Sequence, residues 1–417
     1  MGVYGIYALT NAAFVARGVG PPAMAAVNLV APVLLVLGAV STTVGAGGAS
    51  LVSRHLGAGD PAAAARAAGN AFAVFWATAV VVAVAGLLAL APLLTLLGAR
   101  GAVRGTARDY AVIILAGTLV STGFSSLVRA EGRMRFSTLL WVIPVLVQIT
   151  LDPLLIFGCG LGVRGAALGT VGGQAVSAGM SLWFFFLQRR RPYRIRRADL
   201  RFHAPTVRAL CTVGAPSFLA GFGATLLAVL VNNALAAGGG TVALAAYAVC
   251  ARIQTFVTMP QLGISQGLQP IVGYNAGLGS PARVDRARTL ALRATLLYGA
   301  AIAAVVIVAA GPLVAFFLDE GPAATTARQA LRIVALGIAV AGVPPLISAY
   351  FQSLGRAAPS YLLSIGTLVA VKVPLVLVLG RIGTTALWAA LALGDLVSAL
   401  TALAVLRRFP APARVTH

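Results

Sequence analysis

The sequence predicts an all-α polytopic membrane protein, with twelve transmembrane helices in two pseudo-symmetric six-helix bundles. Of its 417 residues, 59% are hydrophobic and only 10% are charged, and a mean hydropathy of +0.95 excludes a water-soluble globule. Residues 25–62 resemble residues 245–282 without a gap, and a Gly-Arg pair followed by a serine occurs at 132–137 and again at 355–360. The chain is therefore built from two related halves.

The individual spans follow from the lengths of the apolar runs, because about 20 apolar residues are needed to cross roughly 30 Å of hydrocarbon. In the first half these runs cover 1–17, 24–52, 67–97, 109–128, 136–158 and 163–187. In the second half they cover 209–237, 241–275, 294–318, 329–353, 358–379 and 384–406. Several runs exceed one crossing, so we expect tilted helices, proline kinks or ends that lie in the interface.

A polar segment, 188–208, divides the chain into an amino-terminal lobe at 1–187 and a carboxy-terminal lobe at 209–408, which is followed by a tail at 409–417. This linker is rich in arginine: Arg189, Arg190, Arg191, Arg194, Arg196, Arg197, Arg201 and Arg208. Positive charge concentrates in cytoplasmic loops, and most other arginines fall on the same side as the linker. We therefore expect the linker and both termini to be cytoplasmic.

Composition and spacing also exclude several classes of function. The net charge is +22, but the arginines lie between apolar runs and form no basic face interleaved with aromatics, which argues against nucleic-acid binding. Cys159, Cys211, Cys250 and the three histidines have no metal-ligand spacing. An intramembrane enzyme would need His, Asp or Ser-Lys groups clustered at one depth, and the sequence has no such cluster. We expect no metal, no organic cofactor, no catalytic residue and no nucleic-acid partner.

Acidic side chains inside the apolar runs are the main candidates for a functional site, because a charge in hydrocarbon costs several kcal/mol unless it is paired or hydrated. Of the nine acidic residues, only Asp152 and Asp395 lie well inside a run. Asp152 is roughly 9 Å deep in the fifth span, at about 1.5 Å per residue. Asn11 and Thr170 lie at a similar depth, and Gln148 is one turn away on the same face. Their oxygens could bind Na⁺, or Asp152 could carry a proton.

Asp395 lies about eleven residues into the last span, near the middle of the bilayer, where a carboxylate needs a partner or a wet cavity. Lys372 and Arg252 are the possible partners in the same lobe. We expect Asp395 and Lys372 to form a second protonation or substrate site, either as a permanent pair or as a switch that protonation breaks. Alternatively, Lys372 extends toward an interface and Arg252 bonds to backbone carbonyls.

Five short motifs follow one another along the whole chain. They are Phe-Val-Ala-Arg at 14–17, Gly-Ala-Gly-Asp at 57–60, Leu-Asp-Pro-Leu-Leu-Ile-Phe at 151–157, Gly-Ala-Pro-Ser at 214–217 and Gln-Pro-Ile-Val-Gly-Tyr-Asn-Ala-Gly at 269–277. In order and spacing they resemble the multidrug and toxic-compound extrusion family. Asn232 and Asn233, with Gly-Ile-Ser-Gln-Gly at 263–267, resemble its bacterial multidrug-exporter branch.

The resemblance implies a secondary antiporter that exports amphipathic, often cationic, organic compounds in exchange for H⁺ or Na⁺ by alternating access of the two lobes. Its partners would be small organic substrates and the lipid bilayer, and it would act as a monomer in the cytoplasmic (inner) membrane of a bacterium. An alternative from the same superfamily is a flippase or exporter of a lipid-linked intermediate or metabolite.

The resemblance also bears on the candidate site, since Asn11, Gln148, Asp152 and Thr170 match the cation site of the family's amino-terminal lobe. The family usually has an aspartate at the position of Asn11 and an asparagine at that of Gln148. One of two carboxylates is therefore missing, and coupling would rest on Asp152 alone, be weakened or be moved elsewhere. The alternative is that Asp152, together with Pro153, only caps or kinks its span.

Overall fold

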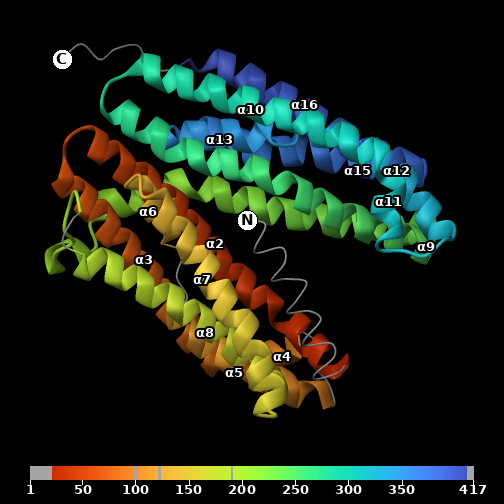
Figure 1. Cartoon of the computed structure of the whole chain (residues 1–417), viewed down its shortest axis with the longest axis horizontal. Helices are drawn as coiled ribbons and strands as arrows, with labels where there is room; N and C mark the ends of the chain where they lie inside the picture. Colours follow the sequence, from red (N-terminus) through yellow and green to blue (C-terminus); the bar gives the residue numbers. More distant parts are fainter. Residues whose placement is uncertain (1–20, 97–101, 121–123, 189–190, 411–417) are drawn as a thin grey trace. The chain divides into compact units, whose positions relative to one another are not determined.

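A computed structural model of the chain describes residues 21–96, 102–120, 124–188 and 191–410, and the regular structure in these ranges is helical (Figure 1). The backbone separates into two compact units, and the boundary between them lies inside one long helix, between Gly214 and Ala215. Gly57–Gly59 are assigned to the second unit.

The first unit contains α2 (Pro21–Gly57), α3 (Pro61–Leu88), α4 (Leu90–Leu96), α5 (Ala102–Gly117), η1 (Thr118–Val120), α6 (Ser125–Ala130), α7 (Met134–Pro153), η2 (Leu154–Gly158), α8 (Gly162–Leu182), η3 (Trp183–Leu187), η4 (Arg197–Leu200) and the start of α9 (Ala204–Gly277). The second unit contains the rest of α9, then α10 (Pro281–Val308), α11 (Ala310–Ala315), α12 (Pro322–Ile338), α13 (Val343–Ser353), α14 (Ala357–Tyr361), η5 (Leu362–Gly366), η6 (Leu368–Lys372), α15 (Val373–Leu379) and α16 (Thr384–Arg408). Of the short segments, η2, η3, η5 and η6 are π-helical turns that continue α-helices.

The prediction of an all-α membrane fold is confirmed. Within the described ranges, nine helical stretches are long and apolar enough to cross a membrane, and one of them, α9, has 74 residues and holds two predicted spans. These two spans meet at Gly240, whose φ of 58° is in the left-handed region that favours glycine. The predicted span at 24–52 coincides with α2, and the one at 1–17 lies outside the described residues.

The two units repeat the same helical corner. In the first, the Ser137 hydroxyl donates a hydrogen bond to the Ser125 carbonyl at 3.0 Å, and in the second the Ser360 hydroxyl donates to the Ser348 carbonyl at 2.9 Å. A glycine lies five residues before each donor serine, and its φ is in the left-handed region: 76° for Gly132 in the first unit and 74° for Gly355 in the second. The repeat in the sequence is therefore a repeat in local structure.

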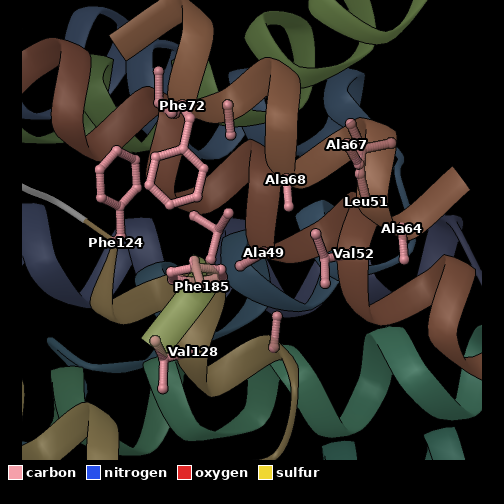
Figure 2. Packing of buried hydrophobic residues seen from close by; sticks show 14 of the residues in the cluster. Ala49, Leu51, Val52, Ala64, Ala67, Ala68, Phe72, Phe124, Val128 and Phe185 are labelled. Carbon is pink, nitrogen blue, oxygen red and sulfur yellow. The ribbon is translucent and has the colours of Figure 1, made fainter. Parts of the chain in front are cut away.

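Buried aromatic rings fill the core of the first unit (Figure 2). Phe72 of α3 and Phe124 have ring centroids 3.9 Å apart, and Phe185 of η3 packs edge-on against Phe72 at 4.9 Å. In the second unit, Trp388 of α16 is 2% exposed and stacks with Tyr247 of α9. Alanine-rich helix faces surround both groups, so neighbouring helices approach closely enough for the rings to fill the space between them.

We expect Phe72→Ala to lower the free energy of unfolding by about 3–5 kcal/mol, because a large buried side chain removed from a packed core leaves a cavity. Phe157→Ala is the matched control in the same unit, since Phe157 is 53% exposed, and should cost less than about 1 kcal/mol. Thermal unfolding of the purified protein in detergent measures both effects. Equal losses of stability in the two variants would contradict this packing.

Candidate cation site

The candidate site of the first unit lies where α7 and α8 run alongside each other (Figure 1). Asp152 and Gln148 are four residues apart on α7, and Gly169 and Gly173 are four residues apart on α8. A Cβ atom at Gly169 would collide with Oδ1 of Asp152, and one at Gly173 would lie 3.2 Å from Cβ of Gln148. Only glycine lets the two helices approach closely enough to enclose both polar side chains.

Gln148 and Thr170 bridge the two helices. Nε2 of Gln148 donates a hydrogen bond to the Thr170 hydroxyl at 2.8 Å, and this hydroxyl donates to the Ala166 carbonyl at 3.0 Å. The structure therefore brings together three of the predicted residues, Gln148, Asp152 and Thr170, at the α7–α8 contact. Asn11, the fourth, lies outside the described residues.

Asp152 is the unusual member of this group. It is 1% exposed, and neither carboxylate oxygen has a hydrogen-bond partner in the part of the chain that the structure describes. An ionised carboxylate without donors is strongly unfavourable in a buried site, whereas a protonated carboxyl or a carboxylate that coordinates a cation is not. The geometry therefore suits a carboxyl group that binds a proton or a metal ion and then releases it.

A second acidic residue, in the other unit, has a partner. Nζ of Lys372, at the end of the π-helical turn η6, lies 2.6 Å from Oδ1 of Asp395 on α16, and the two side chains are 28% and 12% exposed. A Cβ atom at Gly337 would approach Oδ2 of Asp395 to 3.0 Å, and one at Gly394 would approach the Lys372 stem to 3.3 Å. Arg252, the other expected partner, is exposed on α9. The ion pair is therefore formed by Lys372, and its role in function stays a prediction.

The analysis of the sequence did not single out Gly169 and Gly173, although they give the site its shape. Their spacing, with three residues between two glycines, is a known signal for close helix packing in membranes. This signal occurs at many positions in a chain with 47 glycines, so it has little weight without the acidic residue opposite.

Comparison with known proteins agrees with this fold. The sequence profile of the MatE family matches residues 3–154 and 216–378, which is most of both halves. The chain belongs to the MatE family. Its relatives in this family are transporters, and this chain is therefore a multi-pass membrane transporter.

Relatives of this MatE protein align over nearly its whole length. Multidrug export protein MepA of Staphylococcus saprophyticus is 26% identical over 96% of this chain and 89% of its own. The FAD transporter of Shewanella oneidensis is 24% identical over 98% of this chain and 92% of its own. A solved multidrug resistance MATE transporter in an outward-facing conformation matches with a TM-score of 0.91 and 24% identity, over 98% of this chain and 92% of that one.

We expect Gly169→Ala to destabilise the protein by about 1–3 kcal/mol, because the new methyl group would overlap the Asp152 carboxylate. Gly179→Ala, on the same helix, is the matched control: its Cβ would meet nothing within 4 Å, so the better helix propensity of alanine should leave stability unchanged or slightly raised. Thermal unfolding in detergent compares the two. A harmless Gly169→Ala would show that α8 does not lie against Asp152.

Proposed function

We propose that this MatE transporter exports amphipathic, often cationic, organic compounds in exchange for H⁺ or Na⁺ by alternating access of its two lobes. The observation that carries the proposal is the Asp152 carboxyl group, buried between α7 and α8 without a hydrogen-bond donor among the described residues. Relatives named multidrug export protein in several staphylococci support the class of substrate.

Asp152 supplies the coupling in this proposal. An empty, ionised Asp152 is disfavoured in its buried site, so it takes up a cation from whichever side the site faces. Gln148 and Thr170 add amide and hydroxyl oxygens, which are suitable ligands for Na⁺. Asn11 can coordinate a metal ion but cannot exchange a proton, so one carboxyl group has to carry the coupling ion in each cycle.

The Lys372–Asp395 pair is the second part of the proposal. A lysine and an aspartate in contact are together neutral, which lowers the cost of placing both within a membrane span. Protonation of Asp395 would remove its negative charge and leave Lys372 as an uncompensated cation. The pair would thus act either as a permanent lock between η6 and α16 or as a switch in the second lobe.

A second candidate function is export of a metabolite or a lipid-linked intermediate. Lys372 favours it, because an ammonium group within a span could pair with a phosphate or carboxylate of a substrate. The relative named FAD transporter shows that this similarity is not confined to multidrug exporters. Lack of dye export together with export of an anionic compound would favour this alternative.

We further propose that the protein is a monomer in the bacterial inner membrane, with the arginine-rich linker and both termini in the cytoplasm. The distribution of arginine supports this orientation. The bacterial origin of the relatives supports the proposed location in a bacterial membrane.

We expect Asp152→Asn to reduce gradient-driven transport at least tenfold, because an amide can neither bind a proton nor supply a negative ligand. The assay is export of a cationic dye such as ethidium from proteoliposomes with an imposed gradient of either H⁺ or Na⁺. The control is Asp109→Asn, since Asp109 is an exposed carboxylate paired with Arg164. Transport by Asp152→Asn at the rate of the unmodified protein would overturn the proposal for this site.

We expect Lys372→Met to be more harmful than the double change Lys372→Met with Asp395→Asn. The single change leaves a carboxylate without its counter-ion, and loss of one partner of a buried pair costs up to about 3–5 kcal/mol, whereas the double change leaves no charge. Thermal unfolding of the two single variants and the double variant measures the coupling. Additive effects would show that the pair contributes nothing to stability.

A further inference from the structure

The arginine-rich linker is fixed to the first unit at two points. At the first, the Arg191 guanidinium forms an ion pair with Glu131, and the two side chains are 1% and 0% exposed. Nη1 of Arg191 also donates a hydrogen bond to the Phe185 carbonyl at 2.7 Å. The guanidinium lies 4.9 Å, 4.5 Å and 4.6 Å from the ring centroids of Phe184, Phe185 and Tyr193. Burial raises the pKa of Tyr193 well above its usual range, so this ring stays neutral.

The second point of attachment is Asn70 on α3. Its Nδ2 donates a hydrogen bond to the Asp199 carbonyl at 3.2 Å, and its Oδ1 accepts one from the His203 backbone N–H at 2.8 Å. A Cβ atom at the neighbouring Gly69 would collide with the Asp199 backbone, so glycine is needed for this approach. The linker from Arg191 to His203 is therefore held along the first unit.

The fixed linker turns another set of side chains outward. Arg194, Arg197, Arg201 and Arg208 are exposed, and they form no ion pair within the described ranges. Phe202, between them, is 63% exposed. We call these five residues the linker patch. These four cations and one aromatic ring are exposed within the short segment 194–208, and such a combination suits an anion attached to an apolar body.

The length of α3 bears on where the linker patch lies relative to the membrane. This helix has 28 residues and is about 42 Å long at 1.5 Å per residue, so it exceeds a hydrocarbon layer of about 30 Å. Arg66 is among its first residues, before Asn70, and favours this end as the one that extends beyond the hydrocarbon. At the other end of the linker, Trp183 and Leu187 of η3 are 49% and 66% exposed, as expected of side chains that face lipid. With this end of α3 outside the hydrocarbon, the linker patch would lie at the level of the headgroups.

We propose that the linker patch binds the headgroup phosphate of an anionic phospholipid, with Phe202 in contact with the acyl region. Guanidinium groups bind phosphate through paired hydrogen bonds. Because Arg191 and Asn70 already hold the linker in place, little conformational entropy is lost when a lipid binds. A linker whose arginines acted only as an orientation signal would need neither the buried attachment nor particular arginines.

The test uses the purified full-length protein in detergent micelles that contain either phosphatidylglycerol or phosphatidylcholine. We expect phosphatidylglycerol to raise the midpoint of thermal unfolding and native mass spectrometry to show bound phosphatidylglycerol. The triple variant Arg194→Gln, Arg197→Gln and Arg201→Gln should lose at least half of the shift and bind phosphatidylglycerol at least tenfold more weakly. The control, Arg104→Gln with Arg108→Gln and Arg332→Gln, removes three exposed arginines elsewhere and should behave as the unmodified protein.

In the second arm of the test, inorganic phosphate replaces phosphatidylglycerol at the same concentration. It should not shift the midpoint of thermal unfolding. A shift as large as that with phosphatidylglycerol would assign the patch to free phosphate and overturn the lipid proposal. A full response to phosphatidylglycerol in the linker triple variant would overturn it as well. If that variant does not fold, Arg201→Gln alone replaces it and should weaken binding at least threefold. No transport is measured, so the outcome is independent of the proposed antiport.

Discussion

The cost of an unpaired polar group in hydrocarbon is the constraint on which the rest of this structure depends. It requires every backbone group in a span to bond within a helix, and it explains why many serines and threonines here donate to a carbonyl one turn back. It also explains why Asp395 is found against Lys372. Several buried polar atoms lack a partner among the described residues, and Asp152 is the one acidic residue in this group, with both of its oxygens unpartnered there. In the proposed antiport, a bound cation would supply the missing partner.

The two units share an architecture but differ in how they handle a buried acid. Glycines bring backbones together in both, with Gly169 against Asp152 in the first unit and Gly337 against Asp395 in the second. In the first, the helix that approaches the acid places glycine against it, and in the proposed antiport a bound cation would supply the positive charge. In the second, Lys372 supplies it from within the chain. The two halves therefore share their helical architecture, whereas the groups that lie against the buried acid differ between them.

The sequence was sufficient for the helices in the described ranges and for bringing Gln148 near Thr170, because hydropathy and a rise of about 1.5 Å per residue depend only on local order. Gln148, Asp152 and Thr170 were placed together on this basis. The choice between Lys372 and Arg252 as partner of Asp395 depends on the rotation of one helix relative to another, which apolar periodicity does not specify. The docking of the linker was missed for a different reason. Arg191 looks like its neighbours in the sequence, and only the distant Glu131 and a cluster of aromatic rings distinguish it.

The docked linker bears on how the proposed alternating access would work in this chain. A slack tether between two lobes would let them move independently, but the segment from Arg191 to His203 is bound to the first unit. The connection to the second unit is then α9, which continues as helix from Ala204 through the boundary at Gly214 and Ala215. A continuous helix transmits rotation and permits little extension. In the proposed antiport, the polar linker would therefore stay with the first unit, and α9 would carry the covalent connection to the second.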